Sequence, residues 1–226
     1  MINLAQKMNI SLRTSLVKLC NNGYKPAHIL DIGACKGNWA LEVRSYFPGA
    51  TITMIEAIEY KELQQVCARF PNISYKNAIL SDSVKQVQWY EGRDTGDSYY
   101  KEVTVHYAAV KPIDKTTTTL DLLVGDKQYD FIKIDCQGAE LDILKGAGQI
   151  LQSVKVILLE VPFAGVYNAA APSFAEYIAY LDGIGFTCYD ICELHHYKNE
   201  LIQIDIIFVR KGDTVINAVQ NKIVTR

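Results

Sequence analysis

Two glycines, Gly33 and Gly37, have the spacing of a turn that binds a small molecule. The short apolar run from Ile29 to Ile32 ends at Gly33, and Gly37 follows four residues later, just before a helical pattern begins. This order predicts a strand, a tight turn and a helix. Because glycine lacks a Cβ, such a turn can lie close under a bound molecule, which the free N–H groups of the helix then face.

Acids accompany the first two predicted strands. Asp31 lies at the end of the first strand, and we expect its carboxylate to face the crevice and to accept from an ammonium or hydroxyl group. The second apolar segment, 51–55, ends at Glu56, where a nucleotide-binding sheet places a carboxylate against ribose hydroxyls. The glycine turn and Glu56 together indicate a cofactor that contains an adenosine ribose. The alternative for the glycines alone is a purely steric role in the turn.

The glycine spacing separates the two candidate cofactors. A dinucleotide site has the pattern G-x-G-x-x-G, which this turn lacks, so its looser acid-x-Gly-x-x-x-Gly pattern favours S-adenosylmethionine. In such a sheet the loop after the third strand lies beside the adenine. The residues assigned to the cofactor are Asp31, Gly33, Ala34, Cys35, Gly37, Asn38, Trp39, Glu56, Ala57, Ala78, Ser81 and Asp82.

Length and charge restrict the class of protein. The chain has 226 residues, 49% of them hydrophobic, which predicts one well-buried α/β domain. A net charge of −2 and the lack of a Lys/Arg-rich run argue against a nucleic-acid partner. No apolar stretch is long enough to span a membrane, and the first residues do not resemble a signal peptide. We therefore expect a cytoplasmic protein.

Cysteine usage bears on metal binding. The six cysteines lie mostly in apolar segments, as buried thiols of cytosolic proteins do. Cys188 and Cys192 precede His195 and His196, and these are residue types that bind zinc. However, the chain has no second closely spaced cysteine pair, so we expect no metal site.

Apolar periodicity predicts alternating helices and strands. The last two strands, 186–191 and 201–209, are separated by a loop, 193–199, rather than by a helix, which predicts an antiparallel pair. The other predicted strands are 29–32, 51–55, 73–75, 129–135 and 154–159, and the predicted helices are 4–22, 38–47, 59–69, 139–150 and 175–181.

An insertion interrupts this rhythm. The alternation of Val87 and Trp89, and then of Val103, Val105 and Tyr107, predicts a β-hairpin over 84–105 around the polar loop 91–98. After it, the threonines 116–119 predict a short strand and a helix cap. The expected division is a helical segment over 1–27, the main domain over 28–210 and a tail over 211–226.

Five motifs carry a family resemblance. The most specific is the block from Lys133 to Ala147, KIDCQGAELDILKGA, and the others are Asp31 to Gly37, Ile55-Glu56, Thr119-Leu120-Asp121 and Leu159-Glu160. On these motifs the sequence resembles the FkbM family of S-adenosylmethionine-dependent methyltransferases between Ile29 and Arg210. The resemblance implies an α/β, Rossmann-like class I methyltransferase fold: a seven-stranded, mostly parallel sheet with one antiparallel strand and helices on both faces.

The resemblance also implies a reaction, methyl transfer to oxygen. The acceptor is expected to be a hydroxyl of a small molecule or sugar-containing glycan. Three positions depart from the family pattern: Cys35 replaces the usual asparagine, Ala57 stands where proline commonly follows the acid, and Gln137 stands where glutamate is frequent. The first two leave the turn and the ribose carboxylate in place. Gln137 argues against a carboxylate pair that binds metal.

Three residues are candidates for catalysis. Asp135 ends the fourth strand, where the methyl donor should point, so it can contact the cofactor and act as base or orient the acceptor; its alternative is a helix cap near Gly138. Glu160 ends the fifth strand at the same edge. His195 follows the sixth strand near the rim and can act as a base, or can be an ordinary surface histidine. Lys133 is interpreted as scaffold that faces away from this site.

Other functions remain open at this level. The alternatives to an O-methyltransferase are methyl transfer to nitrogen or to a carboxylate, and a binding protein that keeps the cofactor crevice without turnover. A nicotinamide-dependent oxidoreductase is disfavoured by the glycine spacing and by the paired last strands. A homodimer is compatible with the sequence, which does not decide the oligomeric state.

Overall fold

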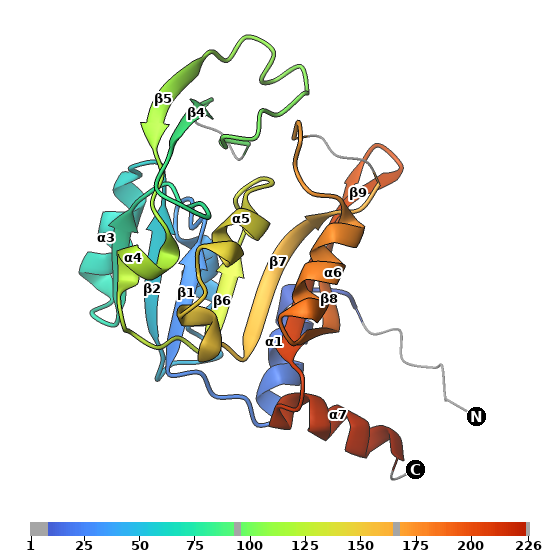
Figure 1. Cartoon of the computed structure of the whole chain (residues 1–226). Coiled ribbons are helices and arrows are strands. Elements are labelled where there is room, and N and C mark those ends of the chain that lie inside the picture. Colours follow the sequence, from blue (N-terminus) through green and yellow to red (C-terminus); the bar gives the residue numbers. More distant parts are fainter. Residues whose placement is uncertain (1–8, 93–95, 165–167, 225–226) are drawn as a thin grey trace.

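A seven-stranded sheet forms the centre of the molecule (Figure 1). The computed structural model describes residues 9–92, 96–164 and 168–224. The strand order is β3-β2-β1-β6-β7-β9-β8, and only β9 runs against its neighbours, which confirms the predicted sheet. The strands are β1 (His28–Ile32), β2 (Thr51–Glu56), β3 (Ile73–Asn77), β6 (Phe131–Ile134), β7 (Val156–Pro162), β8 (Phe186–Tyr197) and β9 (Glu200–Arg210).

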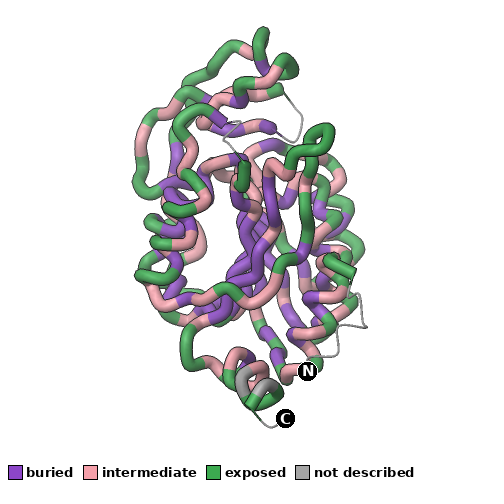
Figure 2. The backbone as a smooth tube through the Cα atoms, turned by 90° about the vertical axis from the view of Figure 1, so that its right-hand side faces the viewer, coloured by how far each residue is buried: buried purple, intermediate pink, exposed green. Residues whose placement is uncertain are grey.

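Helices cover both faces of the sheet because the central strands are apolar on both sides. In β1, Ile29 belongs to one buried cluster and Leu30 to the other. The first cluster packs under α1 (Leu12–Asn21), α2 (Asn38–Val43) and α3 (Lys61–Arg69), and the second under α4 (Leu120–Val124), α5 (Glu140–Lys145) and α6 (Phe174–Gly183). A 3₁₀ turn, η1 (Ile150–Gln152), and α7 (Thr214–Val224) complete the chain. Figure 2 shows the buried central strands between the more exposed helices.

The first helix is shorter than predicted. It begins at Leu12, because the Ser11 side chain accepts a hydrogen bond from the Thr14 N–H (3.2 Å) and caps the helix there. Residues 4–8 of the predicted helix lie outside the described residues. The side chains of Leu16 and Leu19 are fully buried, so the helix belongs to the core of the main sheet.

The inserted hairpin exists, but with a different second strand. β4 (Gln86–Tyr90) pairs with β5 (Pro112–Thr116) and not with residues 103–107 (Figure 1). The alternation there misled the prediction because Val103 and Val105 are exposed, whereas Tyr107 is buried and donates a hydrogen bond to Asp97 (2.6 Å). These residues form turns that pass above the carboxyl ends of the sheet. Farther on, Thr119 caps α4 as predicted.

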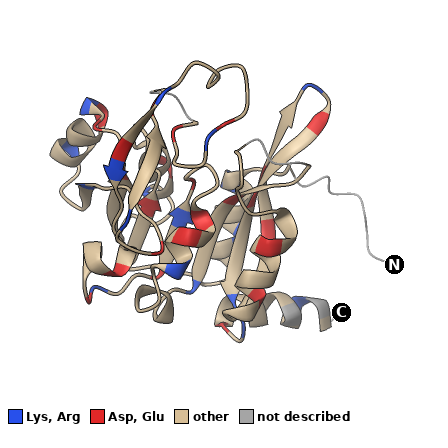
Figure 3. Ribbon diagram, turned by 45° about the horizontal axis from the view of Figure 1, so that its top comes forward, with Lys and Arg blue, Asp and Glu red and all other residues tan. Residues whose placement is uncertain are grey.

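The last two strands pair antiparallel as predicted, but they are longer. The predicted loop 193–199 shrinks to the turn at Lys198 and Asn199, so His195 and His196 lie within β8 rather than after it. Acidic and basic residues are interspersed over the molecule (Figure 3). Among the described residues, no helix is long and apolar enough to cross a membrane.

Candidate active site

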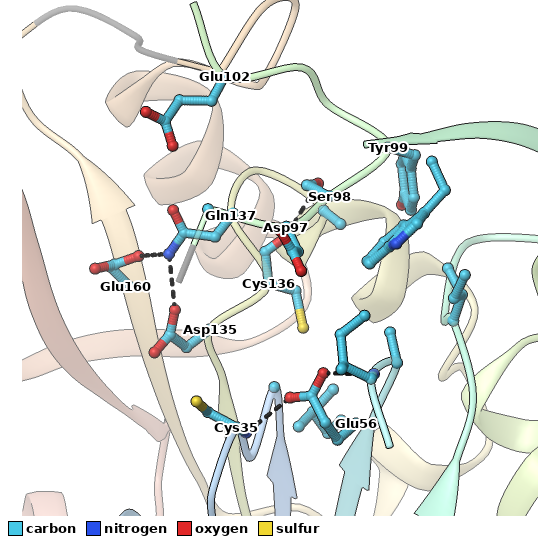
Figure 4. A pocket seen from close by; sticks show the side chains of 18 of the residues that line it. Cys35, Glu56, Asp97, Ser98, Tyr99, Glu102, Asp135, Cys136, Gln137 and Glu160 are labelled. Atoms are coloured by element: carbon cyan, nitrogen blue, oxygen red, sulfur yellow. Dashed lines mark hydrogen bonds between the residues drawn. The ribbon is translucent and has the colours of Figure 1, made fainter. Parts of the chain in front are cut away.

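A large cavity opens at the carboxyl ends of the parallel strands. Its volume is about 890 Å³, near the upper end of the range typical of small-molecule sites. The glycine turn, the end of β2, the segment 96–106 and the ends of β6 and β7 contribute to its walls (Figure 4). In open α/β sheets this edge is where ligands bind.

The glycine turn packs directly against the end of β6. Gly33 has a φ of +73°, and a Cβ at this position would lie 1.8 Å from the backbone oxygen of Asp135. The N–H groups of Gly33 and Ala34 donate to the carbonyl of Ile55 at 2.9 and 3.2 Å. Only glycine allows this approach, so the turn holds β1, β2 and β6 together beneath the cavity.

The start of α2 lies away from the cavity. Gly37 has a φ of +80°, and a Cβ at this position would meet the side chains of Met54 and Leu63 at 3.1 and 3.4 Å. Trp39 makes an edge contact with Phe131, with ring centroids 5.6 Å apart. Ala34, Gly37, Asn38 and Trp39 therefore do not line the cavity, whereas Gly33 and Cys35 do.

Glu56 is fixed at the end of β2 by the backbone of two neighbouring segments. Its carboxylate accepts hydrogen bonds from the N–H of Cys35 (2.7 Å) and the N–H of Ile58 (2.9 Å) (Figure 4). Burial raises the pKa of Glu56, and these hydrogen bonds oppose that rise. The oriented carboxylate faces the cavity and retains lone pairs that hydroxyl groups can use.

The remaining predicted adenine contacts divide into two groups. Ala57 and Ala78 line the cavity beside Glu56. Ser81 and Asp82 do not: Ser81 is buried and donates to Asp82 (3.2 Å), which also pairs with Lys85 at 2.7 Å. Trp89 and Tyr99 also line the cavity. Neither aromatic residue was predicted to belong to the site, because both lie in the inserted segment.

A buried lysine lies directly behind the turn, which corrects the prediction that Lys133 faces away from the site. Its ammonium donates to the carbonyl of Gly33 (2.9 Å) and lies 3.3 Å from Asp135 and 3.6 Å from Asp31. The neighbouring strands β1 and β6 place Asp31 and Lys133 opposite each other in register. Despite its burial, Lys133 has a raised pKa because of the two carboxylates, so it stays charged.

Asp31 differs from the other acids of the site. Its side chain is fully buried, does not line the cavity, and has no hydrogen-bond partner among the described residues. Burial raises the pKa of Asp31 to about 6, although the ammonium of Lys133 opposes the rise. Asp31 thus lies beneath the cavity floor, next to residues that line it.

Asp135 and Glu160 face the cavity side by side, joined by an amide. The Gln137 Nε2 group donates to Asp135 Oδ1 (3.1 Å) and to Glu160 Oε2 (2.7 Å) (Figure 4). Although burial opposes it, the ammonium of Lys133 holds the pKa of Asp135 below its usual range. Burial and neighbouring carboxylates raise the pKa of Glu160 well above its usual range. The two acids therefore differ strongly in their affinity for a proton.

The structure assigns the helix-capping role to another acid. Glu140 accepts from the N–H groups of Cys136 (2.8 Å) and Gly138 (3.1 Å), and the hydroxyl of Tyr177 also donates to it. Asp135 is not the acceptor of these bonds. Its carboxylate remains directed toward the cavity, with 38% of its side chain exposed.

His195 lies on β8 at the far wall of the cavity. Its Nε2 atom is 3.0 Å from Asp205 and 3.9 Å from Glu160. The hydrogen bond with Asp205 raises the pKa of His195, against the effect of burial. Asp205, on β9, was not a predicted residue; the pairing of the last two strands could have indicated it, but their register was not known. The three predicted catalytic residues, Asp135, Glu160 and His195, all line one cavity.

The sheet order, its single reversed strand and the cavity at its carboxyl edge define a Rossmann-like methyltransferase fold. The model of the Methyltransferase FkbM domain matches residues 31–188, and the chain belongs to the FkbM methyltransferase family. S-adenosylmethionine is the cofactor of this family. No curated protein matches the sequence at a significant level.

Solved structures share the fold at low sequence identity. A methyltransferase FkbM from Methylobacillus flagellatus KT is 17% identical, with a TM-score of 0.54 over 80% of this chain and 43% of that one. The Burkholderia thailandensis 1,6-didemethyltoxoflavin-N1-methyltransferase, bound to 1,6-didemethyltoxoflavin and S-adenosylhomocysteine, is 14% identical, with a TM-score of 0.54 and coverage of 88% of this chain and 76% of that one. The magnesium protoporphyrin IX methyltransferase of Synechocystis PCC 6803 is 12% identical, with a TM-score of 0.53 and coverage of 88% and 82%. The chain thus spans less than half of the Methylobacillus protein.

Proposed function

We propose that this chain transfers the methyl group of S-adenosylmethionine to a hydroxyl of a small-molecule or sugar-containing acceptor. The observation that carries the proposal is the position of Asp135: its backbone packs against the Gly33 turn, and Asp135 lines the same cavity as Glu56. The residues suited to the cofactor and the carboxylate suited to the acceptor, that of Asp135, thus line one cavity.

The residues present fit the cofactor. Glu56 is oriented to accept from the ribose hydroxyls, Gly33 and Cys35 line the cavity beside it, and Ala78 and Trp89 supply apolar surface for the adenine. The cofactor supplies an electrophilic methyl group on a sulfonium. The protein has to hold an acceptor oxygen in line with it and exclude water.

Asp135 is the residue that we assign to the acceptor hydroxyl. Its low pKa keeps it ionised near neutral pH, so it can accept the hydroxyl proton in a hydrogen bond and orient the oxygen. Gln137 holds the carboxylate from one side and Lys133 from the other. A group held by two neighbours keeps its orientation without the substrate, which lowers the ordering cost of the reaction.

Calorimetric titration with S-adenosylmethionine, S-adenosylhomocysteine and NAD tests the cofactor assignment. We expect both sulfur ligands to bind and NAD not to bind. Glu56→Gln should weaken S-adenosylhomocysteine binding about tenfold or more, because one hydrogen-bonded charge is worth about 1.5–3 kcal/mol. Glu59→Gln is the matched control, since Glu59 is exposed and does not line the cavity. Equal losses in both variants would place the ribose elsewhere.

A methyl-transfer assay with labelled cofactor tests the reaction, using a panel of hydroxylated, amino and carboxylated acceptors. We expect label in methyl ethers, and we expect Asp135→Asn to reduce transfer at least 100-fold while S-adenosylhomocysteine affinity changes less than threefold. Label only in methylamines or methyl esters would favour the alternatives on nitrogen or carboxylate. Cofactor binding with no transfer to any acceptor would favour a binding protein.

A further inference from the structure

A row of acids crosses the sheet at its carboxyl edge. In the strand register Glu160 lies opposite Asp205, and Asp205 lies opposite Glu193 on the next strand. Like charges directly opposite each other destabilise a sheet unless a cation lies between them. Within the described part of the chain, the basic group that lies within 4 Å of all three carboxylates is the imidazole of His195.

Two of the acids, Glu160 and Asp205, lie close to the histidine, His195. Glu160, His195 and Asp205 each offer one ligand atom, and these atoms all lie within 4.8 Å of one another. They come from three adjacent strands, β7, β8 and β9, which are rigid supports with a fixed spacing. The second oxygen of Glu160 is already held by Gln137, so the oxygen toward His195 keeps a defined direction.

The donor set has the chemistry of a metal site. One imidazole nitrogen and two carboxylate oxygens suit a divalent ion such as Mn²⁺ or Zn²⁺, and protein ligands of such ions lie about 2.0–2.2 Å from the metal. Two ligands at right angles around such an ion lie about 3 Å apart, the separation already present between His195 and Asp205. Glu160 Oε1 lies farther out, 3.9 Å from His195 Nε2, so ion binding requires this oxygen to move about 1 Å closer while Oε2 stays on Gln137.

We propose that Glu160, His195 and Asp205 form a divalent-cation site at the acceptor end of the cavity. Glu160 and His195 line the cavity, so the positions left open on the ion face the acceptor. The inference rests on the proposed function and departs from the expectation of no metal site, because the ligands are two carboxylates and His195 rather than Cys188 and Cys192.

An ion here has a chemical task. The carboxylate of Asp135 is a weak base for an alcohol, and a divalent cation beside the hydroxyl oxygen lowers the pKa of that hydroxyl. The O–H bond then breaks with its proton passing to Asp135, while the oxygen forms a bond to the methyl carbon. The carbon–sulfur bond breaks at the same time, and its electron pair leaves with sulfur as a neutral thioether.

The test is Mn²⁺ binding to the EDTA-treated chain of 226 residues, measured by calorimetry and by electron paramagnetic resonance. We expect one ion per chain. Glu160→Gln, Asp205→Asn and His195→Ala should each weaken binding at least tenfold, because each removes a ligand. Glu193→Gln is the matched control: it removes a carboxylate from the same row, 3.9 Å from His195, without removing a member of the triad, and should change affinity less than threefold.

Two outcomes would overturn the site: no saturable Mn²⁺ binding, or an equal loss in Glu193→Gln, which would indicate diffuse attraction by the acidic row. S-adenosylhomocysteine binding in EDTA serves as the check on folding and on the proposed function. Retained cofactor binding without Mn²⁺ binding rejects the metal site alone. Mn²⁺ binding without cofactor binding rejects the proposed methyl transfer and leaves the metal site in place.

Discussion

Lys133 shows how one residue joins the parts of the site. It contacts the turn through the carbonyl of Gly33 and lies between two carboxylates, Asp31 and Asp135, with only 9% of its side chain exposed. The residue types were visible in the sequence, and strand alternation places Lys133 and Asp135 on one side of β6. The sequence did not give the register of β6 against β1, which brings Asp31 into the cluster.

Replacing this lysine should destabilise the protein strongly. We expect Lys133→Met to lower the free energy of unfolding by about 3–5 kcal/mol, because it leaves buried carboxylates without their cation. Urea unfolding measures the change. Lys145→Met is the control: Lys145 is 49% exposed and pairs loosely with Asp142 (3.5 Å), so its loss should lie within about 0.5 kcal/mol. Similar losses in both variants would mean that the buried ion pairs of Lys133 contribute no more to the free energy of unfolding than an exposed pair.

Asp31 should make stability depend on pH. Its pKa is about 6 in the folded protein against 3.8 ordinarily, so the folded state holds the proton more tightly. The resulting stabilisation is present below the ordinary pKa and is lost as the pH rises through 6. The free energy of unfolding of the wild type, minus that of Asp31→Asn, should fall by about 2 kcal/mol between pH 4 and pH 7.5. Urea unfolding at both pH values checks this, and a pH-independent difference would contradict it.

At the scale of elements, the regular parts were predictable and the insertion was not. The strand, turn and helix around Gly33 follow from apolar runs and glycine positions, and each central strand of the sheet was found within a few residues. The partner of β4 was missed because alternation cannot distinguish a strand from turns such as 103–107, in which one aromatic residue is buried. Asn38, at the start of α2, was assigned to the cofactor but is not among the residues that line the cavity.

The turn should tolerate no side chain at Gly33. Gly33→Ala combines a φ of +73° with a Cβ 1.8 Å from a backbone oxygen, so β1 and β6 would have to separate. We expect a loss of more than about 2 kcal/mol in the free energy of unfolding, together with weaker S-adenosylhomocysteine binding. Gly49→Ala is the control because a Cβ there meets nothing within 4 Å. Equal unfolding midpoints for the two variants would show that the close approach is not required.

At the scale of the whole molecule, the family match and the folded core have different limits. The match covers residues 31–188, but the buried clusters also include Leu16 and Leu19 of α1 and Ile207 and Val209 of β9. β9 lies between β7 and β8, and β8 pairs with β9 alone in the described sheet. The expected helical segment, residues 1–27, therefore contributes α1 to the core of the main sheet.

This topology predicts the behaviour of a shortened chain. A protein of residues 9–188 keeps the whole family match, α1 and β1, but lacks β9 and most of β8, so β7 becomes an open edge of the sheet. We expect it to unfold without a cooperative transition in urea and to aggregate. The control, residues 9–224, retains every described helix and strand and should unfold cooperatively, with S-adenosylhomocysteine raising its thermal midpoint. A cooperative transition in the shorter chain would show that the cofactor half of the sheet folds on its own, and that the reversed strand serves the acceptor end of the cavity rather than the stability of the whole.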